Sequence, residues 1–174
     1  MEKLILFFLP LFFSCSFGDK NTTPQETSEE PTTYYFIRHA EKDISNPNNP
    51  DPELTEEGIK RSEKWAEVFR DISFDAIYSS DFKRTRNTAQ KIADFQEKEV
   101  QLYDVSKLND ENFQKNTKGK TVLVVGHSNT NPAFVNYILE EKKYKDIEES
   151  ESGSLFIVTL MPNGTKTSEV LYIN

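Results

Sequence analysis

Two histidines supply all the imidazole in this chain of 174 residues, and both come just after apolar runs. His39 follows Arg38 at the end of the run 33–37, and His127 stands two positions beyond the run 121–125. A lone histidine is most often a structural residue. Two histidines in matching positions instead indicate one shared site.

Two arginines are the cations expected beside these histidines. Arg38 adjoins His39, and Arg84 follows a third apolar run, 74–78, by six residues. Guanidinium groups stay charged and donate paired hydrogen bonds to phosphate oxygens. Imidazole can attack phosphorus and form a covalent phosphohistidine. A metal site is the weaker interpretation, because no acidic residue adjoins His127 and no His-x-x-x-His spacing exists.

The elements that must position these groups alternate along the chain. Strands are predicted at 33–37, 74–78, 100–103 and 121–125, and helices at 55–70, 82–96, 107–118 and 131–140. Strands at 154–161 and 167–173 flank a Pro-Asn-Gly turn signal, which predicts a terminal antiparallel hairpin. The expected fold class is an α/β three-layer sandwich, with a mostly parallel central sheet between helices. Ligands of such sheets bind beyond the carboxyl ends of the strands, where both histidines fall.

Four segments in order carry a resemblance to a known family. Residues 38–40 (RHA), 54–58 (LTEEG), 79–89 (SSDFKRTRNTA) and 126–127 (GH) resemble the signature elements of the histidine phosphatase superfamily, which has the phosphoglycerate mutase fold. Together they span about residues 33–140. The resemblance implies a phosphoglycerate mutase-like fold and a single domain over residues 33–174.

The resemblance also implies roles for individual residues. His39 would be the nucleophile that becomes phosphorylated, and Arg38, Arg84 and His127 would complete the phosphate pocket. Arg84 rather than Arg86 matches the pocket arginine, because it stands five residues after the first serine of the 79–89 segment. No cofactor and no metal are expected.

Two serines are expected to contact the substrate as well. Ser45 stands where many members carry an asparagine, and Ser128 begins a stretch whose backbone amides lie near a helix start.

The acid that would protonate the leaving group matches less well. Some members place an aspartate directly after the second histidine, where this chain has a serine. Others place a glutamate before the central strand, which makes Glu111 the leading candidate and Asp110 its neighbour. Glu41 and Asp81 are further candidates. Without such an acid, the enzyme would suit substrates with good leaving groups.

The activity expected is that of a metal-independent phosphatase acting on a phosphorylated small molecule or a phosphoprotein. The short connection 103–118 suggests an open pocket, which favours hydrolysis over the alternative of a phosphomutase. A non-catalytic module that binds a phosphorylated ligand is the second alternative, although a pure binder has no need of a nucleophile. The net charge of −8 argues against nucleic acid as a partner.

The first 32 residues differ in composition from the rest. Residues 1–17 contain an apolar stretch too short to span a bilayer comfortably, and they resemble a bacterial lipoprotein signal with Cys15 as the lipidated residue. Residues 18–32 are polar and predict a flexible tether. We therefore expect a lipid anchor in a membrane of a bacterial cell envelope, on the periplasmic or outer-surface side.

Overall fold

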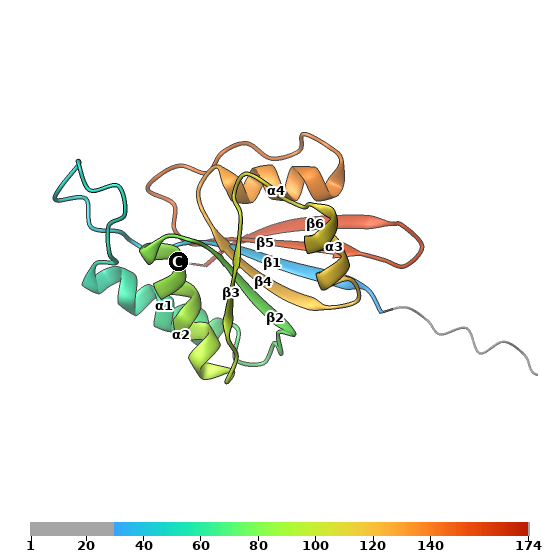
Figure 1. Cartoon of the computed structure of the whole chain (residues 1–174), viewed down its shortest axis with the longest axis horizontal. Helices are drawn as coiled ribbons and strands as arrows, with labels where there is room; N and C mark the ends of the chain where they lie inside the picture. Colours follow the sequence, from blue (N-terminus) through green and yellow to red (C-terminus); the bar gives the residue numbers. More distant parts are fainter. Residues whose placement is uncertain (1–29, 174) are drawn as a thin grey trace, which may run out of the picture.

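A computed structural model describes residues 30–173 of the chain (Figure 1). The predicted signal segment, Cys15 and nearly all of the predicted tether lie outside these residues. In chain order the elements are β1 (Thr32–Arg38), α1 (Glu56–Val68), β2 (Ala76–Ser80), α2 (Lys83–Phe95), β3 (Val100–Tyr103), α3 (Glu111–Thr117), β4 (Thr121–Gly126), α4 (Thr130–Leu139), β5 (Ser154–Leu160) and β6 (Lys166–Tyr172). None of the helices in the described region is long and apolar enough to cross a membrane.

The six strands form one sheet in the order β3-β2-β4-β1-β5-β6. The first four run parallel to one another, whereas β5 pairs antiparallel with β1 and β6 pairs antiparallel with β5. The expected α/β fold, with a mostly parallel sheet and a terminal hairpin, is confirmed. Because β5 is antiparallel, its first residues lie at the same edge as the last residues of β1, with Leu155 opposite Ile37.

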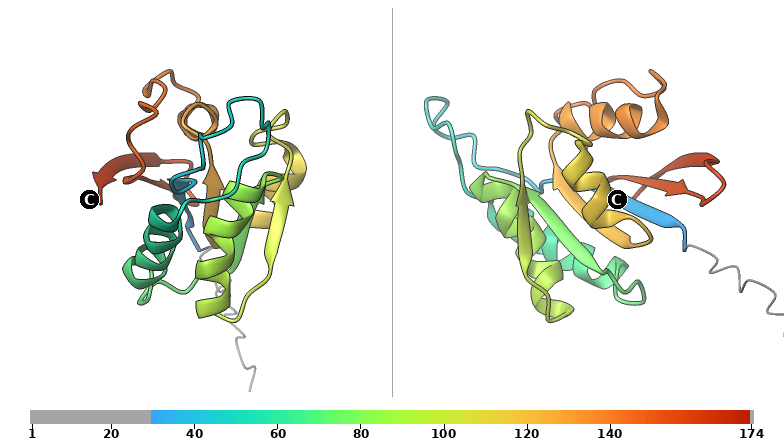
Figure 2. Two further views of the ribbon diagram at one scale, coloured as in Figure 1. Left: turned by 90° about the vertical axis from the view of Figure 1, so that its left-hand side faces the viewer. Right: turned by 45° about the vertical axis from the view of Figure 1, so that its right-hand side comes forward.

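Side chains of the central strands alternate between two apolar cores, as a strand buried on both faces requires. Val122 and Val124 of β4 enter a core with α3 and α4, while Leu123 and Val125 enter a core with α1 and α2. Figure 2 shows α4 on one side of the sheet and α1 with α2 on the other. Helices on both faces thus cover the sheet, and the first turns of α2 and α4 bring Arg84 and Thr130 to the edge where the parallel strands end.

Two predicted elements, β2 and α3, differ most from the structure in their bounds. Strand β2 begins and ends two residues later than predicted, because Ser79 and Ser80 are fully buried and remain paired with β3. Helix α3 begins at Glu111 rather than at 107, because Asp110 caps it by accepting a hydrogen bond from the Phe113 amide.

Candidate active site

A pocket of about 290 Å³ opens at the carboxyl edge of the parallel strands. It is lined by His39, Lys42, Phe82, Arg84, Val105, His127, Ser128, Asn129, Thr130 and Glu149. The two histidine rings lie edge to face with their centroids 5.5 Å apart. The structure thus brings together two groups separated by 88 positions in the chain, as the sequence predicted.

The imidazole of His39 is oriented by a backbone carbonyl. Its Nδ1 lies 2.8 Å from the carbonyl oxygen of Ala40, which can only accept, so Nδ1 carries the proton. The Nε2 atom therefore keeps its lone pair. The side chain is buried, and this burial, helped by the neighbouring Arg38, lowers the pKa of His39 to about 3. At neutral pH the ring is uncharged and nucleophilic.

The imidazole of His127 is oriented by a serine hydroxyl. Its Nε2 lies 2.9 Å from Oγ of Ser80. The Ser80 hydroxyl donates a hydrogen bond to Oγ1 of Thr85, and the Thr85 hydroxyl in turn donates to the backbone carbonyl of Ser80. Ser80 must then accept from Nε2–H, and Nδ1 of His127 keeps its lone pair beside Arg84, whose Nη2 lies 3.5 Å away. Burial, with Arg84 as the next cause, lowers the pKa of His127 to about 4.

The guanidinium of Arg38 is buried beneath the segment that leads into β5. Its Nη1 donates to the carbonyl oxygens of Glu148, Glu149 and Glu151, at 3.3, 2.7 and 3.0 Å. Its Nη2 donates to the Glu149 carboxylate at 2.8 Å. Its Nε is buried and has no hydrogen-bond partner among residues 30–173.

Arg84 is held at the start of α2. Asp51 accepts a hydrogen bond from the Lys83 amide at 2.9 Å and lies 3.7 Å from Nη1 of Arg84. The guanidinium carbon stacks 4.4 Å from the centre of the Phe82 ring. Nε and Nη1 of Arg84 are buried, with no acceptor within hydrogen-bond range in the described part of the chain.

Unpartnered buried donors are rare in folded proteins and call for an explanation. The two arginines contribute three such nitrogen atoms; two belong to Arg84, which lines the pocket with both histidines, and one to Arg38, which is buried behind the lining residues. A tetrahedral oxyanion supplies several acceptor oxygens and a compensating charge, so it matches this arrangement. No group of three or more His, Cys, Asp or Glu side chains that could hold a metal ion occurs within residues 30–173.

Local packing explains why the matched motifs contain glycine. A Cβ on Gly58 would lie 2.2 Å from the carbonyl oxygen of Glu41, so α1 packs directly on the turn after His39. A Cβ on Gly126 would lie 2.1 Å from Oδ1 of Asn131, beneath the first turn of α4. Both glycines permit a close approach of elements that frame the pocket.

The four predicted acids lie outside the residues that line this pocket. Glu111, the leading candidate, is exposed on the first turn of α3, and Asp110 is the cap of that helix. Glu41 forms an ion pair with Arg61, and Asp81 is exposed and pairs with a surface arginine.

The two serines expected to bind substrate fall in different places. Ser45 is exposed in the loop after β1, where its amide donates to Asp43, and it does not line the pocket. Ser128 does line the pocket, and its hydroxyl lies 2.6 Å from Oε1 of Glu149.

Glu149 is a pocket residue that the sequence reasoning missed. Its carboxylate accepts hydrogen bonds from Arg38 and Ser128 and lies 3.6 Å from Nζ of Lys42. The hydrogen bond from Ser128, with the charges of Arg38 and Lys42, lowers the pKa of Glu149. One signal could have indicated it: a final antiparallel strand must begin at the carboxyl edge, so the segment before it must reach the site.

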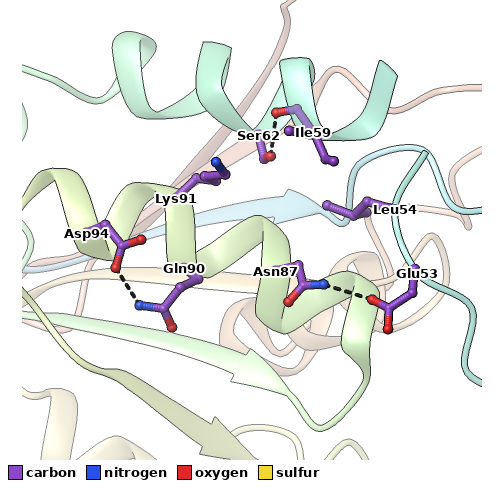
Figure 3. A pocket seen from close by; sticks show the side chains of 8 residues that line it. All are labelled: Glu53, Leu54, Ile59, Ser62, Asn87, Gln90, Lys91 and Asp94. Atoms are coloured by element: carbon purple, nitrogen blue, oxygen red, sulfur yellow. Dashed lines mark hydrogen bonds between the residues drawn. The ribbon is translucent and has the colours of Figure 1, made fainter. Parts of the chain in front are cut away.

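A second hollow, of about 340 Å³, lies between α1 and α2 (Figure 3). Its polar side chains largely satisfy one another: Asn87 donates to Glu53 at 3.0 Å, and Gln90 donates to Asp94 at 2.7 Å. It contains no histidine and none of the unpartnered guanidinium groups. The pocket around His39 is therefore the stronger candidate for chemistry.

Residues 34–114 match the family model of the histidine phosphatase superfamily (branch 1). The resemblance to this superfamily is therefore confirmed. The matched range includes His39 and Arg84 but ends before His127, whose place in the site comes from the fold. A search of curated proteins found no match.

Several solved structures share the fold at low sequence identity. A phosphoserine phosphatase from Entamoeba histolytica, in complex with 3-phosphoglyceric acid, is 22% identical with a TM-score of 0.62 over 82% of this chain and 98% of that one. A phosphoglycerate mutase from Bacillus anthracis is 18% identical with a TM-score of 0.63, covering 84% and 95%. A putative phosphohistidine phosphatase, SixA, from Agrobacterium tumefaciens is 20% identical with a TM-score of 0.60, covering 82% and 99%. These likenesses confirm the phosphoglycerate mutase-like fold.

Proposed function

We propose that this protein is a phosphatase that works through a phosphohistidine on Nε2 of His39. The observation that carries the proposal is a neutral imidazole with a free lone pair near three guanidinium nitrogen atoms that have no hydrogen-bond partner among residues 30–173. The match to the histidine phosphatase family model and the phosphatases among the similar structures agree with it.

The reaction has two steps. Nε2 of His39 attacks phosphorus as the bond to the leaving oxygen or nitrogen breaks, and Arg38 and Arg84 neutralise the charge on the phosphoryl oxygens. Water then attacks the phosphohistidine, the P–N bond breaks and inorganic phosphate leaves. The lone pair on Nδ1 of His127 lies 3.5 Å from Nη2 of Arg84, and it can accept a hydrogen bond from the attacking water once Arg84 binds the phosphoryl oxygens.

The pocket carboxylate favours leaving groups that need no proton. Glu149 is ionised at neutral pH because its pKa is lowered, so it is a poor general acid. The phenolate of an aryl phosphate leaves more easily than a simple alkoxide, and so does the neutral imidazole of a phosphohistidine whose other ring nitrogen is protonated. The substrate is a phosphorylated small molecule or a phosphoprotein.

Hydrolysis is favoured over phosphoryl return to the substrate. The connection between β3 and α3 is only seven residues long, and Val105 is its one residue that lines the pocket. Among the similar structures is a phosphoglycerate mutase, so a phosphomutase remains the second candidate. The phosphomutase would be favoured if the phosphoryl group on His39 were transferred to an acceptor alcohol faster than to water.

The test is a brief reaction of the purified protein with p-nitrophenyl phosphate labelled in its phosphoryl group. We expect an acid-labile, base-stable label on His39, and a fall in turnover of at least about 1,000-fold in His39→Ala. The exposed Ser45→Ala variant should keep wild-type turnover and serves as the control. Undiminished turnover in His39→Ala would exclude the mechanism.

We also propose that Cys15 is lipidated and anchors the domain to a membrane of a bacterial cell envelope. The support is the sequence pattern of residues 1–17 and the polar segment that follows. Mass spectrometry of the mature N-terminus tests this. A diacylglyceryl mass on Cys15 is expected, and an unmodified chain that begins at Met1 would contradict the proposal.

A further inference from the structure

The backbone around Glu149 is fixed at the mouth of the pocket. Three carbonyl oxygens between 148 and 151 accept from buried Arg38, and the Ile147 amide donates to the Ser128 carbonyl at 2.8 Å. Glu149 therefore cannot move far from the site without the loss of several hydrogen bonds to a buried charge.

The side chain of Glu149 lies between the phosphate-binding groups and solvent. Its carboxylate forms an ion pair with Nη2 of buried Arg38, yet 66% of the Glu149 side chain remains exposed. Lys42 is a second cation near it, at 3.6 Å, and Arg84 lines the same pocket close enough to interact with its charge. Glu149 is thus one of the residues that a group attached to a phosphate in the pocket can contact.

A bound phosphate changes the charge balance around Glu149. The free N–H groups of Arg38 and Arg84 would bind the phosphate oxygens, and the dianion would then compete with Glu149 for the Arg38 charge. Two like charges would lie close together in a partly buried site, which is unfavourable. A cation on the substrate would restore the balance.

We propose that Glu149 selects substrates that carry a positive charge close to the phosphate, such as an ammonium group on the leaving side. This inference rests on the proposed phosphatase function and narrows its substrate class. It does not make Glu149 a proton donor. The residue acts by attraction of the cation and by repulsion of phosphate esters that lack one.

The test compares two ligands of nearly equal size, O-phosphoethanolamine and n-propyl phosphate, as competitive inhibitors of p-nitrophenyl phosphate hydrolysis. Measurement at about pH 8 keeps both phosphates dianionic. We expect wild-type protein to bind the ammonium ligand about three- to fivefold more tightly, the range of a partly exposed ion pair. Glu149→Gln should bring the two inhibition constants together.

Two further variants sharpen the result. Lys42→Met removes the competing cation, so it should increase the preference for the ammonium ligand. Glu148→Gln removes a charge from the neighbouring exposed residue, which does not line the pocket, and should leave the preference unchanged. The inference is overturned if wild-type shows no preference, if Glu148→Gln acts like Glu149→Gln, or if Glu149→Gln lowers kcat tenfold with the preference intact.

Binding can be measured apart from turnover. Calorimetric dissociation constants of both ligands for His39→Ala, with and without Glu149→Gln, need no catalysis. A preference that depends on Glu149 in this background supports the inference even if the phosphohistidine is not found. Equal affinities in this background, together with a phosphohistidine found on His39 of the wild-type protein, refute the selectivity and leave the proposed function standing.

Discussion

Ser80 decides which nitrogen of His127 faces the pocket. Its hydroxyl is committed as a donor to Thr85 and therefore accepts from Nε2–H of the imidazole. Without that acceptor the ring could turn or change tautomer, and a buried N–H would lose its partner. A residue outside direct reach of the phosphate thus controls a residue within reach of it.

Ser80→Ala should lower kcat/KM for p-nitrophenyl phosphate about tenfold, the effect of one lost hydrogen bond of about 1.4 kcal/mol. Ser79→Ala is the matched control, because Ser79 is equally buried but its hydroxyl donates to the Ser80 carbonyl. Steady-state kinetics of both variants provide the measurement. Equal losses in the two variants would show that burial alone, and not the imidazole contact, explains the effect.

At the scale of elements, α1 and the turn after β1 are built as one unit. The Thr55 amide donates to the Glu41 carbonyl, and the Thr55 hydroxyl caps α1 by accepting from the Gly58 amide. Ala40 in turn donates to Thr88 of α2. The turn that carries His39 is therefore held by both helices on that face of the sheet.

Gly58→Ala should destabilise the protein by about 1–3 kcal/mol, because the added Cβ meets a backbone carbonyl that cannot move without shifting the turn. The shift should also reduce kcat/KM, since His39 stands two residues before Glu41. Urea unfolding and kinetics on one preparation measure both effects. Glu57→Ala, at the exposed position next to buried Gly58, should leave kcat/KM unchanged and cost less than about 1 kcal/mol of stability. A stable, fully active Gly58→Ala would contradict the packing argument.

The elements could be predicted from sequence because apolar periodicity and turn signals are local. The placement of His39, Arg84 and His127 followed, since parallel strands share one carboxyl edge. Glu149 and Asp51 were not predictable in the same way. Each lies in an irregular segment without periodicity. Glu149 is held in the pocket by its tertiary contact with Arg38, and Asp51, which does not line the pocket, contacts Lys83 and Arg84.

At the scale of the whole molecule, residues 30–173 by themselves supply both of the apolar cores and the pocket described above. A chain that begins at Glu30 should therefore match the full chain in kcat and in the free energy of unfolding of the domain. A chain that begins at Tyr34 loses the Thr32 acceptor for the Gly119 amide and the Thr33 amide bond to the Lys120 carbonyl. It should be less stable by about 1–3 kcal/mol in urea unfolding. Equal stability of the two shortened chains would contradict this boundary.

The two buried histidines link the stability of the fold to pH. An unfolded histidine takes up a proton below about pH 6.5, but the folded ones do so only near pH 4 and 3. Between these limits the unfolded state binds more protons, so stability is complete above pH 6.5 and is lost as the pH falls. At pH 5 each histidine should have removed roughly 2 kcal/mol from the free energy of unfolding.

Urea unfolding at pH 7 and at pH 5 measures this loss, in a window above the range where carboxylates titrate. The double variant His39→Asn/His127→Gln should lose most of the dependence, whatever its absolute stability, and each single variant should lose about half. A wild-type protein equally stable at both pH values would show that the rings are solvated or already charged in the folded state. A neutral nucleophile at His39 would then no longer be tenable. The same burial that holds both imidazoles neutral for catalysis should thus make the fold sensitive to mild acid.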